Sequence, residues 1–100
     1  MANKYYIERL QMVIAHMHKC ETRHVQTAPV NETFHGRPVW QGDVEVFEVT
    51  AGHPSAKNVY AWSYKDDKGE HFAAILGIPP VKTPLDAVKA FIVAEGKKNL

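Results

Sequence analysis

Hydrophobic residues near the start of the chain recur at intervals of three and four. This spacing is typical of one face of an α-helix, with polar residues opposite. It predicts a helix that begins after Asn3, a residue type favoured at N-caps, and ends around Glu21 to Arg23. The predicted apolar stripe consists of Tyr6, Ile7, Leu10, Val13, Ile14, Met17 and Cys20.

Apolar and polar residues alternate through the middle of the chain, which is the pattern of half-buried β-strands. Two turn signals, His35-Gly36-Arg37-Pro38 and Asp66-Asp67-Lys68-Gly69, divide this region into two hairpins. Pro29 lacks a backbone donor, so the first strand should lie at a sheet edge. The predicted strands cover residues 25–34, 39–50, 57–65 and 70–78.

The second predicted strand changes phase, since its apolar positions run through Trp40, Val44 and Val46 and then move to Phe47 and Val49. A regular strand keeps one face apolar throughout. The shift therefore indicates a β-bulge or a strand that is buried on both faces.

The last element has clear helix signals. Thr83 is a good N-cap, Pro84 suits the first helical position, and Asp86 follows at the third. Gly96 is the expected residue just after the helix. The predicted apolar stripe of this helix is Leu85, Val88, Phe91 and Ile92.

These elements predict one α+β domain over residues 1–100, in the order α-β-β-β-β-α. We expect an antiparallel sheet with both helices on one face, because that face would then form the core. The other face would remain partly open. A homodimer formed through the open face or through an edge strand is the expected assembly.

Composition narrows the function classes. The chain has 100 residues, 45% hydrophobic and 23% charged, with a net charge of +1 and no block of like charge. That balance argues against a partner held mainly by phosphate contacts. Cys20 is the single cysteine, and neither a secretion signal nor a membrane span is evident. We therefore expect a cytoplasmic protein.

The order of elements resembles that of the double-stranded RNA-binding domain, which has three strands. The His35-Gly36-Arg37-Pro38 loop lies where that family carries a Gly-Pro-x-His loop, with the residues here in another order. The family grips phosphates with lysines at the start of its last helix, where this chain has only Lys82 and then Lys89. The resemblance implies a similar arrangement of helices and sheet, and it implies RNA binding only by analogy with that family.

Aromatic residues alternate on the third predicted strand, where Tyr60, Trp62 and Tyr64 share one face. They could stack against bases, with Arg37 and His35 as further binding residues. They could instead form the layer on which the helices pack, because the opposite face offers only small residues. We favour the core interpretation.

Six histidines make a metal site worth considering. His16 and Cys20 are four apart on the predicted helix, and His24 would extend the row if the helix continued. Zinc needs three or four convergent ligands, and no C-x-x-C or H-E-x-x-H motif occurs. We therefore expect neither a metal nor another cofactor, and interpret Cys20 as a core residue.

Catalytic residues are not evident either. Cys20 as a nucleophile would sit near the helix C-terminus, where the dipole opposes a thiolate. Glu45 and Glu48 should point to opposite faces, and Glu32 could approach Glu45 or Asp43 across the hairpin. Carboxylates of this kind are usually solvated, unless one of them proves to be buried.

The leading interpretation is a non-enzymatic binding or assembly module whose partner is a second copy, with another protein or a small ligand also open. Nucleic-acid binding is the alternative, based on the topology, the aromatic strand, Arg37 and Lys57. A small enzyme with a histidine and carboxylate pocket is the third. The sequence does not identify a ligand or a reaction.

Overall fold

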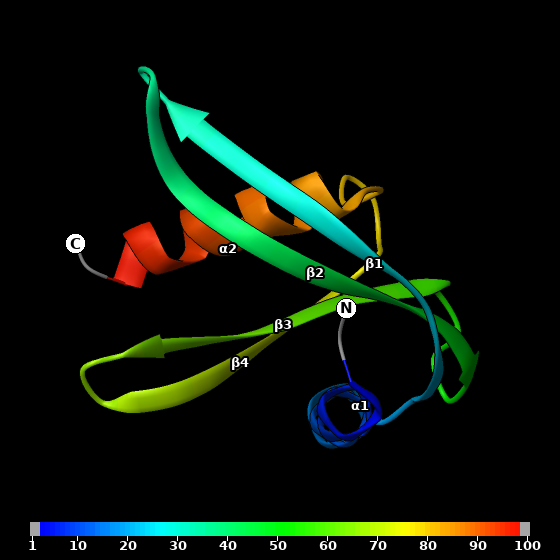
Figure 1. Cartoon of the computed structure of the whole chain (residues 1–100). Helices are drawn as coiled ribbons and strands as arrows, with labels where there is room; N and C mark the ends of the chain where they lie inside the picture. The colour runs from blue at the N-terminus through cyan, green and yellow to red at the C-terminus, as the bar shows by residue number, and fades with distance from the viewer. Residues whose placement is uncertain (1–2, 99–100) are drawn as a thin grey trace.

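The computed structural model describes residues 3–98 and has the predicted α+β class and element order (Figure 1). A four-stranded antiparallel sheet in the order β1-β2-β3-β4 lies between two helices over this range. The elements are α1 (Lys4–His18), β1 (Glu21–Phe34), β2 (Arg37–Ala51), β3 (Asn58–Asp66), β4 (Gly69–Leu76) and α2 (Pro84–Lys98).

The start of α1 is confirmed, but its end was predicted too late. The Asn3 side chain accepts a hydrogen bond from the Tyr6 backbone N–H at 2.8 Å, as an N-cap does. Lys19 then adopts a left-handed conformation with φ of 58°, and its N–H donates to the Ala15 carbonyl. This geometry ends an α-helix. Cys20 therefore lies after the helix and is not part of its stripe.

The start of β1 and the ends of β4 and α2 also differ from their predicted positions. β1 begins at Glu21, four residues early, because it pairs with β2 from there. β4 ends at Leu76, two residues earlier than predicted, because Leu76 is its last residue paired with β3. The predicted stop of α2 at Gly96 is wrong, because the helix runs through it to Lys98.

The cap of α2 and the first hairpin agree with the sequence signals. The Asp86 N–H donates to Thr83 Oγ1 at 3.1 Å. His35 and Gly36 both have positive φ, 52° and 77°, which is the geometry of a type I′ turn. β1 is an edge strand, so Pro29 takes the position in which a missing donor is tolerated.

The helices lie on opposite faces of the sheet, so the prediction that both cover one face is wrong. Val59 and Ala61 of β3 pack with Leu10 and Ile14 of α1. The alternate residues Tyr60 and Trp62 pack with α2 through Ala87 and Val88. The face of β3 that carries Val59 and Ala61 is apolar, so it too must be buried against another element. Its small side chains leave room for the large residues of α1.

The two hairpins pair only briefly with each other. β2 and β3 pair from Glu45–Ala61 to Glu48–Asn58, whereas each hairpin is much longer. Beyond this ladder the hairpins separate, as Figure 1 shows. α2 packs where they diverge, and Phe91 contacts Trp62 edge to face, as Trp40 does from the other hairpin. The partly open face expected from the sequence is therefore not found within residues 3–98, because each sheet face packs against one helix.

None of the helices within residues 3–98 is long and apolar enough to cross a membrane.

Candidate functional site

The outer face of α2 carries apolar side chains that the fold leaves exposed. Val93 is 57% exposed and Leu85 is 38% exposed. The opposite side of the helix holds Ala87 and Val88, which are fully buried. A helix that is apolar on both sides is typical of one with a partner on its outer face as well.

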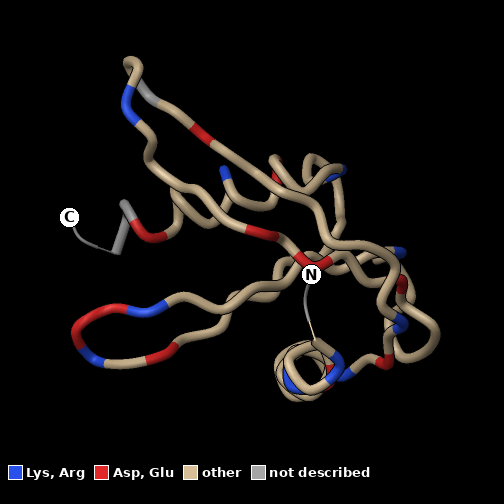
Figure 2. Tube along the Cα trace, in the orientation of Figure 1, with Lys and Arg blue, Asp and Glu red and all other residues tan. Residues whose placement is uncertain are grey.

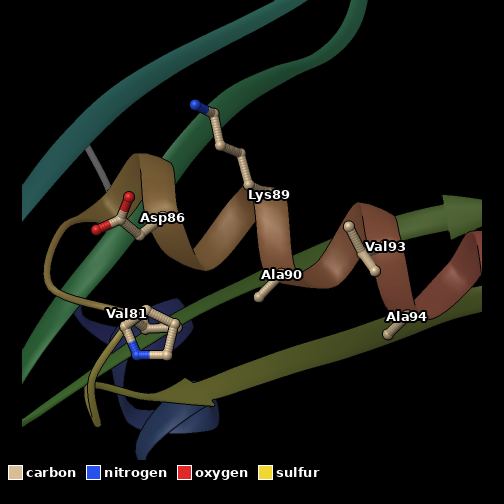
Figure 3. Close-up of a pocket in the computed structure, with 7 residues that line it drawn as sticks. Val81, Asp86, Lys89, Ala90, Val93 and Ala94 are labelled. Atoms are coloured by element: carbon tan, nitrogen blue, oxygen red, sulfur yellow. The ribbon is translucent and has the colours of Figure 1, made fainter.

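Two hollows of about 490 and 510 Å³ lie on either side of the ridge formed by Lys89 and Val93. Lys89 and Val93 line both of them. The first hollow, drawn in Figure 3, is completed by Pro80, Val81, Asp86, Ala90 and Ala94. The second is completed by Glu32, Thr33, Val39 and Ile92. We call the residues of the two hollows together the α2 surface.

The charges on the α2 surface are few and of both signs. Lys89 Nζ lies 3.8 Å from Glu32 Oε2, at the border of the second hollow. Asp86 accepts a hydrogen bond from the Lys82 backbone N–H at 3.0 Å, and this bond lowers the pKa of its carboxyl. Along the coloured part of the trace, acidic and basic residues are likewise interleaved (Figure 2). A partner of one strong charge is therefore not indicated.

A second polar feature lies on the α1 side of the sheet, where Glu45 is buried with only 1% of its surface exposed. Its Oε1 lies 2.9 Å from His24 Nε2 and accepts a hydrogen bond from Thr27 Oγ1 at 2.5 Å. The His24 ring also contacts Phe47 edge to face. A buried carboxylate is stable only with such partners.

A β-bulge in β1 brings these partners together. His24 and Thr27 are three residues apart, so a regular strand would place them on opposite faces. His24 pairs with Phe47 and Gln26 pairs with Val46, which leaves Val25 as the extra residue. The bulge shifts the phase of the strand and turns both side chains toward Glu45.

The His24–Glu45 pair has the arrangement in which a carboxylate orients an imidazole for proton transfer. However, none of the hollows described here is lined by either residue. Cys20 is buried, and burial raises the pKa of its thiol, so the thiolate needed for attack is disfavoured. The pair therefore holds β1 to β2, and nothing in its surroundings defines a substrate.

The aromatic strand forms core under α2. Tyr60 and Trp62 are buried, and Tyr64 is half-buried against Phe91. The Tyr60 hydroxyl donates to the Lys82 carbonyl at 3.1 Å, at the rim of this layer. In this arrangement the Tyr60 and Trp62 rings are not available for stacking against bases.

The other predicted binding residues lie apart from the aromatic strand. His35 and Arg37 are exposed at the turn between β1 and β2. The structure therefore does not bring them together with Tyr60 and Trp62 into one surface.

The candidate metal ligands also lie apart. His16 is exposed on α1, Cys20 is buried after it, and His24 points toward Glu45 from β1. The helical row that would have aligned them ends at His18. Among residues 3–98 no group of three or more His, Cys, Asp or Glu side chains is placed to bind a metal ion.

Two features of the site were missed from the sequence. The sequence pattern favours a solvated Glu45, which is in fact buried. It also allows Glu32 to approach Glu45 or Asp43, but Glu32 pairs opposite Trp40 and its carboxylate faces Lys89. Val93 was outside the predicted stripe of α2. The run Phe91-Ile92-Val93-Ala94 is a usable signal, since four successive apolar residues exceed what one buried face of a helix can hold.

Comparison with protein families, with curated proteins and with solved structures found no match to this chain.

Proposed function

We propose that this domain is a non-enzymatic assembly module that forms a homodimer through the α2 surface. The observation that carries the proposal is the exposed Val93 between two apolar hollows. Burying such a surface removes apolar area from water, and this gain has to exceed the entropy lost when two molecules associate.

A second copy is the occupant that the charges favour. The α2 surface carries Lys89 together with Asp86 and Glu32, so it has no strong excess of one sign. Two identical surfaces of this kind do not repel each other strongly. A partner selected by charge would instead be expected to meet a surface of one sign.

The edges of the sheet offer less for assembly than α2 does. On β4, the Ala74 carbonyl is already bonded by His18 Nε2 at 2.7 Å. On β1, the Thr22 carbonyl accepts from Gln11 Nε2, and Pro29 interrupts the row of donors. Side chains and prolines of this kind protect edge strands from pairing with another chain.

The other two expected functions have less support. Nucleic-acid binding relied on Tyr60 and Trp62, which are buried under α2. Catalysis would rely on His24 and Glu45, which line none of the hollows described above.

The test is the molar mass in solution, measured by light scattering over a range of micromolar concentrations. We expect twice the monomer mass of 11.3 kDa for the wild-type protein. Val93→Glu should be monomeric, because it places a charge in the contact. Met12→Glu is the matched control, since Met12 is an equally apolar residue, 72% exposed on α1, and its variant should remain dimeric. A monomeric wild-type protein would refute the proposal.

A further inference from the structure

The residues around the first hollow have the spacing of a packing site for a second helix. Asp86, Lys89, Ala90 and Val93 lie at positions i, i+3, i+4 and i+7 of α2, and all four line the hollow (Figure 3). Four residues with this spacing form the hole that receives one side chain of a facing helix. Ala90 forms the bottom of this hole, because its side chain is the smallest of the four.

The same helix also supplies a side chain that fits the hole. Val93 is the exposed apolar residue at its edge, with 57% of its surface accessible. The rim carries one acidic and one basic group, Asp86 and Lys89, so an uncharged side chain can enter without meeting a net charge. Lys89 can also lay its aliphatic stem along an apolar neighbour while its ammonium stays in water.

A surface that contains both the protruding residue and its hole can pair with itself across a two-fold axis. A two-fold axis perpendicular to α2 makes the two helices antiparallel. Residues close to the two-fold axis then face their own counterparts in the other copy. A residue further along the helix lies about 1.5 Å further from that axis for each position, in both copies. Small residues near the axis allow the closest approach.

We propose that the dimer pairs α2 antiparallel to its counterpart across a two-fold axis between Ala90 and Val93, with Val93 of each copy in the hole formed by Asp86, Lys89, Ala90 and Val93 of the other. This inference rests on the proposed function, since it specifies the geometry of that dimer.

The geometry makes Ala90 the position at which two copies can be joined. Helices in such contact are about 8–10 Å apart, which leaves facing Cα atoms near the axis within disulfide reach. In an antiparallel pair the two Asp86 residues lie on opposite sides of the two-fold axis, each several residues from it along its helix, so they are far apart. In a parallel pair they would face each other as closely as the two Ala90 positions do.

The experiment is disulfide cross-linking of single-cysteine variants under mild oxidation, in a Cys20→Ala background. Ala90→Cys should form dimers at least tenfold faster than Lys89→Cys, the adjacent exposed control, and tenfold faster than Asp86→Cys. Circular dichroism verifies that each variant is folded, which matters most for Asp86→Cys because Asp86 caps the helix.

Each other outcome has a distinct meaning. If the uncross-linked protein is dimeric but Ala90→Cys reacts no faster than Lys89→Cys, the antiparallel contact is wrong and the proposed function stands. If Asp86→Cys reacts as fast as Ala90→Cys, the helices are parallel and this inference is wrong. If the wild-type protein is monomeric, the proposed function fails and the inference fails with it.

Discussion

The Ser63 backbone N–H donates to the Tyr6 hydroxyl oxygen at a distance of 3.0 Å. The Ser63 hydroxyl also donates to the same oxygen at 3.2 Å. Ser63 lies on β3 just beyond Ala61, where pairing with β2 has ended. A side chain of α1 thus replaces the strand partner that Ser63 loses when the hairpins separate. This contact lets the sheet open for α2 without leaving a backbone donor unpaired.

Tyr6→Phe should therefore destabilise the domain. The substitution keeps the ring and removes only the acceptor, so the partly buried Ser63 N–H is left without a partner. A loss of about 1–2 kcal/mol in the free energy of unfolding is expected. Urea denaturation measures it. Tyr5→Phe is the control, because Tyr5 is 72% exposed on the same helix, and it should change stability little. Equal effects of the two variants would contradict this role.

Removal of the buried Glu45 side chain should lower the free energy of unfolding further than Tyr6→Phe does. Glu45→Ala removes the acceptor of both His24 and Thr27 and leaves a cavity between the strands. Losing hydrogen bonds to a buried carboxylate costs about 1.5–3 kcal/mol. Chemical denaturation should show this loss in the free energy of unfolding.

The matched control is Glu48→Ala on the same strand. Glu48 pairs with Arg23 at 3.1 Å, but both side chains are more than half exposed. Exposed ion pairs of this kind contribute roughly 0–1 kcal/mol. If Glu48→Ala were as destabilising as Glu45→Ala, the buried cluster would not be the stabilising element that we describe.

The elements and their order could be predicted from the sequence because their signals are local. Asn3 and Thr83 mark helix starts through their own side chains, and His35-Gly36 specifies its turn by backbone conformation. Pro29 indicates an edge strand for an equally local reason. Each of these features depends on a few neighbouring residues, so no knowledge of the tertiary fold is needed.

The placement of the helices and of the buried carboxylate depends on distant contacts. The small residues Val59 and Ala61 do not reveal that α1 will cover them. The two partners of Glu45 meet only because a bulge at Val25 changes the phase of β1. The phase shift near Val46 indicates either a bulge or burial on both faces of β2, and the second holds, because Val44 to Phe47 are all buried. It did not indicate that Glu45 would be buried with them.

Gly52 predicts a strict requirement for glycine in the connection between β2 and β3. Its φ is +98°, and a Cβ atom there would lie 2.6 Å from the Lys19 carbonyl oxygen. Gly52→Ala should therefore cost more than the roughly 1–2 kcal/mol of the left-handed conformation alone. Gly36→Ala isolates that conformational cost, because Gly36 has φ of +77° with open space around it. Thermal unfolding of both variants checks this, and a milder effect at Gly52 would disprove the close contact.

Asp86 predicts the direction of acid destabilisation. The hydrogen bond from the Lys82 backbone N–H, with smaller contributions that include the Thr83 hydroxyl, lowers the pKa of the Asp86 carboxyl in the folded protein. A group whose pKa is lower when folded stabilises the fold above its unfolded pKa. That stabilisation is lost as the pH falls through the folded pKa. The wild-type protein should therefore lose this contribution below about pH 4, the ordinary range of an aspartate.

Asp86→Asn removes the titrating group, so its melting temperature should be lower than that of the wild-type protein at neutral pH. The difference between the two proteins should narrow as the pH falls below about 4, because the wild-type carboxylate is then protonated. Thermal unfolding across this range, at one fixed protein concentration, measures the difference. Hydrogen bonds from the Lys68 backbone N–H and the His71 ring also lower the pKa of the Asp66 carboxyl, so the difference between the wild-type protein and Asp66→Asn should narrow over the same pH range. A constant difference between wild-type and Asp86→Asn at every pH would show that the Asp86 charge does not stabilise α2.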